Sequence, residues 1–140
     1  MEPSALLQPV FTLAAWTVVM LLWMLATRIP AMASAGIDAQ EARDTARLID
    51  MLPTEITRIS NNYNHLFEQP TLFYAVVITL AVLDLQDTIH VACAWAFVAI
   101  RIAHSLVQAT VDIVNIRFAL FALSWLVLIV MIVRGALGAF

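Results

Sequence analysis

The sequence has little charge and no lysine. Charged residues occupy 12% of its 140 positions, and all seven basic residues are Arg. Soluble domains usually carry about a quarter charged residues, so this composition argues against a soluble domain. The formal net charge of −3 also differs from the basic balance of proteins that bind nucleic acid. We therefore expect no nucleic acid among its partners.

Residues that bind metals or form crosslinks are scarce as well. Cys93 is the only cysteine, which excludes a disulfide within the chain. His104 has no second histidine or cysteine at a metal-ligand spacing. The sequence also contains neither a Gly-rich phosphate loop nor a nucleophile elbow. We expect no metal site.

Hydrophobic residues, by contrast, make up 63% of the chain, and its mean hydropathy is +0.92. A chain of this length cannot bury so much apolar surface in its own core, so lipid must cover the rest. Four apolar runs, at about 6–26, 62–83, 89–111 and 116–133, are interpreted as helical spans of a bilayer core about 30 Å thick. No basic residue precedes the first run, so we interpret it as a retained helix and not as a signal peptide. We predict one all-α domain over 1–140, an integral membrane four-helix bundle.

The basic residues of the connectors predict the orientation. The polar connector 28–61 holds four Arg, the turn between the second and third spans holds none and two Asp, and Arg117 opens the fourth span. Because Arg-rich loops stay in the cytoplasm, we place the first and third connectors there and both termini on the non-cytoplasmic side. If the chain is bacterial, its membrane is then the inner, cytoplasmic one.

Several polar residues lie inside the spans, where a charge is costly unless it is paired or hydrated. Asn64 and Glu68 are four apart, and Arg101 and His104 are three apart, so each pair is expected on one helix face. With Arg117, they lie at one level near the cytoplasmic side. Two interpretations stay open. One is a buried ion-pair cluster, such as Glu68 with Arg101, that only fixes helix register; the other is a ligand site.

Single residues of this group also have purely structural explanations. Arg117 alone is typical of a cation that extends from a helix end to lipid headgroups. His104 alone is typical of a histidine hydrogen-bonded between helices. His65 and His90 are expected at the membrane interface.

Two motifs resemble a known family. The first is the stretch from Asn64 to Tyr74, Asn-His-Leu-Phe-Glu-Gln-Pro-Thr-Leu-Phe-Tyr. The second is Arg101-Ile-Ala-His104, followed by Arg117 sixteen positions after Arg101. Together with four spans and a long first connector, they resemble the MAPEG family, the membrane-associated proteins in eicosanoid and glutathione metabolism. The pattern is most similar to the bacterial branch of this family.

The resemblance implies a homotrimer that binds glutathione in a cleft between neighbouring subunits, open to the cytoplasm. It implies that Arg117 is the catalytic residue, which stabilises the thiolate of glutathione. A nearby cation lowers the pKa of a thiol in this way. Arg side chains suit the two carboxylates of glutathione, and a carboxylate suits its ammonium. By position, the binding residues are Asn64, Glu68, Arg101, His104, Arg58 and Arg28.

The implied function is that of a membrane-bound glutathione-dependent transferase or peroxidase acting on lipophilic electrophiles. The alternative is a non-catalytic lipid-binding or scaffold protein on the same fold, or an accessory subunit of a larger complex. Gln108 and Phe121 favour the alternative, because many family members have Tyr at these two positions. The expected partners are further copies of the chain, membrane lipids and lipophilic small molecules.

Overall fold

The chain folds entirely into helices. The computed structural model describes residues 3–140, and in this range it contains no strand. The predicted all-α class is therefore confirmed. The elements, in chain order, are α1 (Pro3–Ser34), the 3-10 turn η1 (Glu41–Arg43), α2 (Thr45–Met51), α3 (Thr54–His65), α4 (Gln69–Val82), α5 (Thr88–Ala109) and α6 (Val114–Ala139).

Four helical stretches of the described residues are long and apolar enough to cross a membrane. They are Ser4–Ser34, Thr54–Val82, Thr88–Ala109 and Val114–Ala139. This bears out the prediction of four candidate membrane-spanning helices. The first helix continues beyond its apolar run into the polar connector, and the second stretch combines two helices, α3 and α4.

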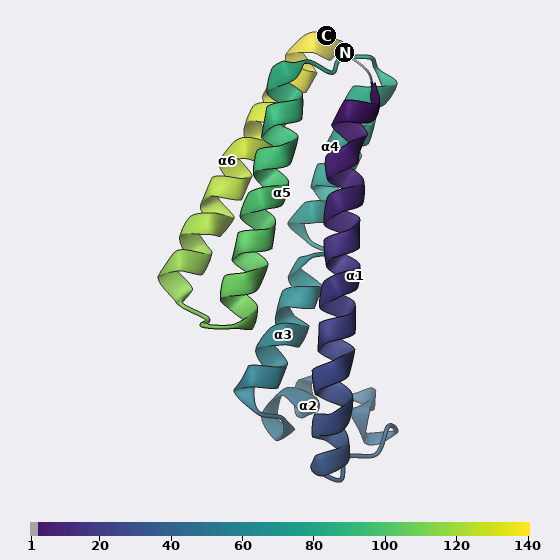
Figure 1. Cartoon of the computed structure of the whole chain (residues 1–140), viewed down its shortest axis with the longest axis vertical. Coiled ribbons are helices and arrows are strands. Elements are labelled where there is room, and N and C mark those ends of the chain that lie inside the picture. Colours follow the sequence, from purple (N-terminus) through teal and green to yellow (C-terminus); the bar gives the residue numbers. More distant parts are fainter. Residues whose placement is uncertain (1–2) are drawn as a thin grey trace.

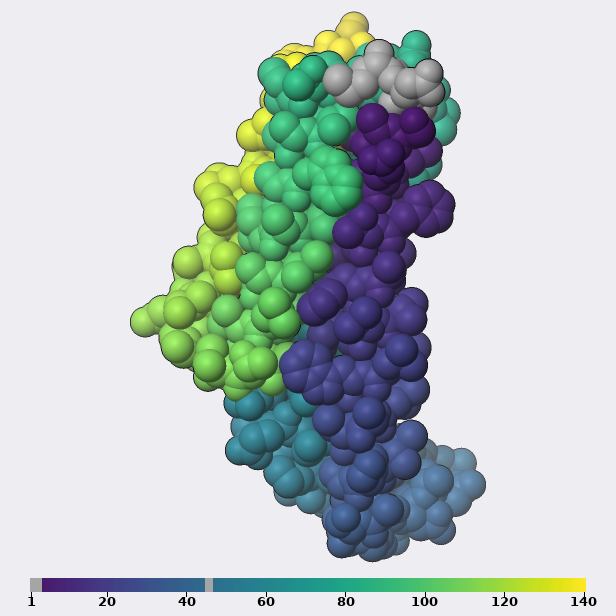
Figure 2. Space-filling view, viewed as in Figure 1, coloured from purple at the N-terminus to yellow at the C-terminus, as the bar shows by residue number. Residues whose placement is uncertain are grey.

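The helices form an elongated bundle. α5 and α6 make an antiparallel hairpin, and α1 packs against α3, α4 and α5 (Figure 1). In the space-filling view of the same face, α1 lies directly against α5 over much of its length (Figure 2). Both chain ends lie at the end of the bundle that carries the α4–α5 turn (Figure 1). The connector after α1 and the α5–α6 turn lie toward the opposite end.

The core is a stripe of apolar side chains along the bundle. On α1, Leu6, Leu13 and Met20 follow one another at intervals of seven residues, and all are fully buried. Seven residues are about two helical turns, so the three side chains share one face. They belong to the same core as the aromatic pair Phe73 and Phe97 of α4 and α5. The outward faces are also apolar, as a lipid-facing surface requires.

The connector after α1 folds back onto the bundle. Leu48 of α2 and Leu52 are buried in a small second core with Ile37. Ala31 and Met32, near the end of α1, pack against this cluster. The polar connector is therefore packed beside the end of α1. Leu48 and Leu52 also line one of the cavities described below.

The second span is broken in its middle. α3 ends at His65 and α4 begins at Gln69, with Glu68 as its N-cap residue. Pro70 sits in the first turn of α4, where its missing N–H is tolerated. In a continuous helix, Pro70 could not donate to the carbonyl of Leu66 and its ring would clash with that carbonyl, so the break falls before it. The expectation of one continuous helix through Asn64 and Glu68 is wrong, because α3 ends between these two residues.

The end of the bundle with the chain termini is closed by a charged cap. Asp87 precedes α5 and accepts a hydrogen bond from the backbone N–H of His90 at 2.8 Å. Its second oxygen accepts from Arg134 of α6 at 2.5 Å. The His90 N–H, followed by the Arg134 guanidinium, lowers the pKa of the Asp87 carboxyl, although partial desolvation opposes this. The cap joins the start of α5 to the last turns of α6.

Candidate functional site

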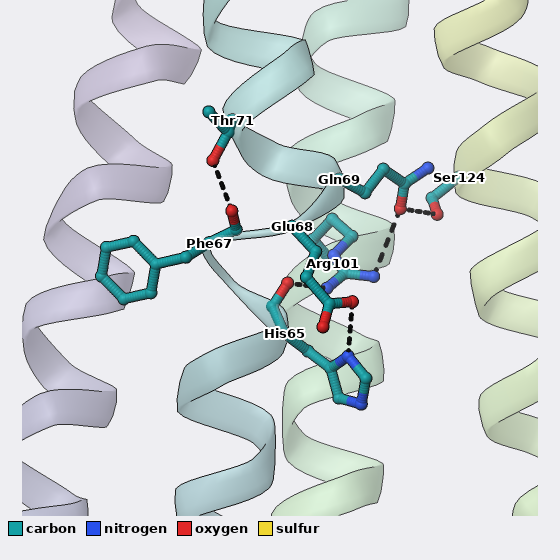
Figure 3. A network of polar contacts seen from close by, with 7 residues as sticks. All are labelled: His65, Phe67, Glu68, Gln69, Thr71, Arg101 and Ser124. Carbon is teal, nitrogen blue, oxygen red and sulfur yellow. Dashed lines mark hydrogen bonds and ion pairs between the residues drawn. The ribbon is translucent and has the colours of Figure 1, made fainter.

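The break between α3 and α4 holds a buried polar cluster. Arg101 of α5 is 1% exposed. Its guanidinium donates to the backbone carbonyl of His65 at 3.2 Å and to Oε1 of Gln69 at 3.3 Å (Figure 3). Carbonyls at the end of a helix have no partner within the helix, and a cation satisfies them well. Arg101 thus bridges the end of α3 and the start of α4.

Gln69 is the centre of this cluster. The Ser124 hydroxyl of α6 lies 2.9 Å from the same Gln69 Oε1 that accepts from Arg101 (Figure 3). The same hydroxyl also lies 2.7 Å from the carbonyl of Phe121, so its single proton is shared between two acceptors. Gln69 and Ser124 are almost completely buried. Three helices therefore meet at one glutamine side chain, which the sequence analysis did not single out; a Gln followed by Pro70 within an apolar span is the signal that marks it.

An ion pair of Glu68 with Arg101, the example given for one of the two open interpretations, is not formed among the described residues. Within residues 3–140, the Arg101 guanidinium bonds to an amide oxygen and a backbone carbonyl, not to a carboxylate. The carboxylate of Glu68 instead lies 2.8 Å from Nδ1 of His65 (Figure 3). Arg101 therefore connects α3, α4 and α5 through an amide oxygen and a backbone carbonyl.

A cavity of about 260 Å³ opens beside this cluster. It has a polar wall and an apolar one, since Val114, Phe118 and Phe121 line it together with charged and polar side chains. Four residues expected in the site from the sequence contribute to the polar wall, namely Glu68, Arg101, His104 and Arg117. We call this the first cavity.

A second cavity, of about 290 Å³, adjoins the first. His65, Glu68 and Arg117 line both cavities. Asn64 and Arg58 of α3 line the second cavity but not the first. The break in the helix therefore does not separate Asn64 from Glu68 functionally, because both line the same space.

A third cavity, of about 350 Å³, extends the series toward the connector. Asn61 and Asn64 line it as well as the second cavity. Arg28 of α1 lies here, beside Leu48 and Leu52. The seven residues expected from the sequence are thus distributed over three adjoining cavities, with Arg28 farthest along the series from Arg101.

Arg117 is held by an acidic neighbour. Its guanidinium donates to Oδ1 of Asp112 at 2.6 Å, and the side chains are 27% and 29% exposed. Asp112 lies in the turn between α5 and α6 with a left-handed backbone (φ 53°), and its N–H bonds to the carbonyl of Val107. An anionic ligand in the cavities would therefore share Arg117 with this carboxylate. Asp112 was missed by the sequence analysis, although it lies five positions before Arg117.

His104 projects from α5 into the first cavity and is 5% exposed. Its Nδ1 is buried and has no hydrogen-bond partner among the described residues. A buried polar atom without a partner is costly, so this nitrogen is available to a ligand or to water. No group of three His, Cys, Asp or Glu side chains in residues 3–140 has the arrangement of a metal site.

The comparisons with known proteins are consistent with this architecture. The sequence model of the MAPEG family matches residues 6–137, almost the whole chain. The chain belongs to the MAPEG family. The curated proteins and the solved structures yield no match. Membership places this MAPEG protein among membrane proteins associated, as a family, with glutathione-related transferase and peroxidase roles.

Two positions at which the resemblance led us to expect Tyr carry other side chains in this MAPEG protein. Phe121 lines the first cavity, is 39% exposed and packs edge-to-face on Trp125 at a centroid distance of 6.4 Å. Gln108 lines the second cavity and is almost fully buried, with its Oε1 unpartnered among the described residues. Both positions therefore face the cavities, but neither supplies a phenol.

Proposed function

We propose that this MAPEG protein is a membrane-bound glutathione-dependent transferase or peroxidase that acts on lipophilic electrophiles, of the bacterial branch of the family. The observation that carries the proposal is the first cavity, where the cation of Arg117 meets polar and aromatic walls inside a membrane-spanning bundle. A charged cavity within apolar helices is costly unless it serves a ligand or an ion path.

The polar residues match the groups of glutathione. Its two carboxylates suit the guanidinium groups of Arg58 and Arg28, which line the second and third cavities. Its ammonium suits Glu68, since the contact with His65 occupies only one of the two carboxylate oxygens. Asn64 lies beside Glu68 in the second cavity and is placed to bond the peptide groups.

The thiol belongs in the first cavity in this arrangement. Arg117 would stabilise the thiolate there, with Arg101 and His104 behind it. The aromatic side chains of Phe118 and Phe121 form the wall along which a lipophilic electrophile would approach. The sulfur would attack the electrophilic carbon, form a C–S bond and displace the leaving group, with catalysis by proximity and charge stabilisation.

We also propose that the protein is a homotrimer whose neighbouring subunit completes this site. Phe118 is 69% exposed and Phe121 is 39% exposed beside a charged cavity. A second subunit packed on this face would cover the aromatic rings and exclude lipid from the ligand. A detergent-corrected mass equal to a monomer would contradict the trimer and the shared site together.

The orientation follows from the positions of the Arg residues. The connector after α1 and the start of α6, whose first turn carries Arg117, lie away from the end that holds both termini (Figure 1). We propose that this Arg-rich end faces the cytoplasm and both termini the other side, in the inner membrane if the chain is bacterial. Reporter fusions at the two termini test this, and cytoplasmic reporters at both would refute it.

Calorimetric titration of the detergent-purified protein with glutathione tests the function. We expect binding by the wild type, and loss of conjugation of an aryl halide in Arg117→Ala. Arg134→Ala is the matched control, because this Arg lies at the opposite end of α6 and pairs with Asp87. No binding at millimolar glutathione would refute the proposal.

The second candidate is a non-catalytic lipid-binding, scaffold or accessory protein. Phe121 favours it because a phenyl ring cannot donate a hydrogen bond, and Asp112 favours it because this carboxylate already neutralises Arg117. Glutathione binding without turnover of the aryl halide, and restored turnover in Phe121→Tyr, would support this alternative over the first.

A further inference from the structure

His65 and Glu68 form a histidine–carboxylate pair at the break in the second span. The Nδ1 atom of His65 lies 2.8 Å from Oε2 of Glu68 (Figure 3). Both residues are held by the backbone around them. The His65 carbonyl accepts from the buried Arg101, and the N–H of Glu68 bonds to the same carbonyl. The pair is therefore anchored to a rigid part of the bundle, although its side chains are 40% and 63% exposed.

The contact with the carboxylate selects one form of the imidazole. When Nδ1 carries the proton that Glu68 accepts, Nε2 of the neutral ring has a free lone pair and can act as a base. The carboxylate also stabilises the imidazolium that forms when Nε2 takes a proton. His65 lines both the first and the second cavity, as does Arg117. The base and the thiolate-stabilising cation therefore border the same space.

We propose that His65 is the general base that deprotonates the thiol of bound glutathione and that Glu68 is the positioning residue that orients it. This inference rests on the proposed function. Nε2 takes the thiol proton, Glu68 stabilises the resulting imidazolium, and Arg117 stabilises the thiolate. With an aryl halide, the sulfur forms the C–S bond, the carbon–halogen bond breaks, and the halide leaves. The imidazolium then returns its proton to water.

Two features of the site weaken the activation of the thiol by other residues. Phe121 has no hydroxyl with which to assist the thiol. Asp112 pairs with Arg117 at 2.6 Å, so Arg117 stabilises a thiolate less strongly than an unpaired Arg would. A positioned base activates the thiol by accepting its proton, which neither Phe121 nor Asp112 does in this arrangement.

His104 is the competing base in the first cavity. It is 5% exposed, whereas the side chain of His65 is 40% exposed and lines both the first and the second cavity. The Nδ1 atom of His104 has no partner among the described residues, so no carboxylate orients this ring or stabilises its charged form. The geometry therefore favours His65.

The surroundings of His65 are mostly cationic. From the helices and turns around these cavities, the charged or titratable groups are Arg28, Arg58, Glu68, Arg101, His104, Asp112 and Arg117. Arg58, Arg101 and Arg117 line the cavities that His65 also lines, and Glu68 is the carboxylate in direct contact with it. Glu68→Gln is therefore expected to weaken the base without removing it.

A pH series of kcat at saturating glutathione, with an aryl halide as the second substrate, tests the proposal. We expect His65→Gln to lower kcat about 100-fold at neutral pH, with glutathione affinity by calorimetry within about twofold of the wild type. The gap is expected to close above pH about 8.5, the ordinary pKa of a thiol, because glutathione then deprotonates unaided. Glu68→Gln is expected to lower kcat at saturating glutathione about tenfold, since it removes the orientation and charge that Glu68 supplies to His65. Its glutathione affinity is expected to fall as well, because Glu68 is also proposed to bind the ammonium.

His90→Gln is the matched control. His90 also lies three residues from a carboxylate, with Nδ1 3.1 Å from Oδ1 of Asp87, but at the other end of the bundle. We expect its kcat and pH profile to match the wild type, with folding checked by circular dichroism. His104→Gln is measured in parallel.

The outcomes separate this inference from the proposed function. A wild type that does not bind glutathione overturns both. Glutathione binding with an unchanged kcat and pH profile in His65→Gln overturns only the inference. Loss of glutathione binding in His65→Gln makes this residue a ligand contact and overturns it as a base. A 100-fold loss in His104→Gln but not in His65→Gln assigns the base to His104 instead.

Discussion

The stacked rings of Phe73 and Phe97 determine how α4 is aligned with α5. Their centroids are 4.3 Å apart with an interplanar angle of 8°, and both side chains are fully buried. Phe73 lies one turn after Gln69 on α4, and Phe97 lies one turn before Arg101 on α5. The stacked pair is therefore adjacent to the Gln69–Arg101 hydrogen bond and holds it in register.

Replacing either ring with alanine is expected to destabilise the bundle. In soluble cores, Phe→Ala costs about 3–5 kcal/mol. Lipid tails are as apolar as the ring, so only the packing part of this cost remains in a membrane, about 2 kcal/mol of unfolding free energy for each variant. The double variant Phe73→Ala/Phe97→Ala is expected to lose about 1 kcal/mol less than the sum, because the first substitution already removes the stacked contact.

The assay is unfolding by SDS in mixed micelles, followed by circular dichroism and by the fluorescence of the four Trp residues. Leu126→Ala is the control, since this α6 side chain is 61% exposed and its loss is expected to change stability by less than about 0.5 kcal/mol. Strictly additive losses for Phe73 and Phe97 would refute the reasoning. Equal losses for Leu126 and the two rings would refute it as well.

Two further predictions concern charged pairs. Asp112→Asn releases Arg117, so glutathione affinity measured by calorimetry is expected to rise about twofold to fivefold, as for a partly exposed ion pair; a fall in affinity would contradict the proposed role of this Arg. The folded pKa of Asp87 is depressed, so its pairing with the His90 N–H and Arg134 stabilises the fold above the ordinary pKa of about 3.9 and is lost as the pH falls through the folded value. Asp87→Asn is expected to remove this acid-dependent loss, less than about 1 kcal/mol for so exposed a pair, in SDS unfolding as the pH is lowered below about 3.9.

Much of the candidate site was visible in the sequence. Glu68, Arg101, His104 and Arg117 are polar residues inside apolar runs, and the structure places all four around one cavity. Residue type and position within a span were sufficient to select these four residues, because a polar side chain in a membrane helix turns away from lipid toward other helices.

The sequence did not predict which of these residues contact one another. The sequence allowed a pair of Glu68 with Arg101 as one interpretation, yet Arg101 bonds to Gln69 and to the carbonyl of His65. The reason is the break before Pro70. It turns Glu68 out of the helical phase of α3, exposes carbonyls at the end of α3, and starts a new helix with Gln69 pointing at α5.

The sequence by itself determined the number of candidate spans, the all-α class and the set of polar residues that lipid cannot accept. These properties depend on composition and run length, which each segment carries independently of its neighbours. Only the tertiary structure decided that His65 pairs with Glu68, that Asp112 holds Arg117, and that Gln69 joins three helices. Such contacts depend on the rotation and register of one helix against another, and these are set by packing, as the stacked rings of α4 and α5 illustrate.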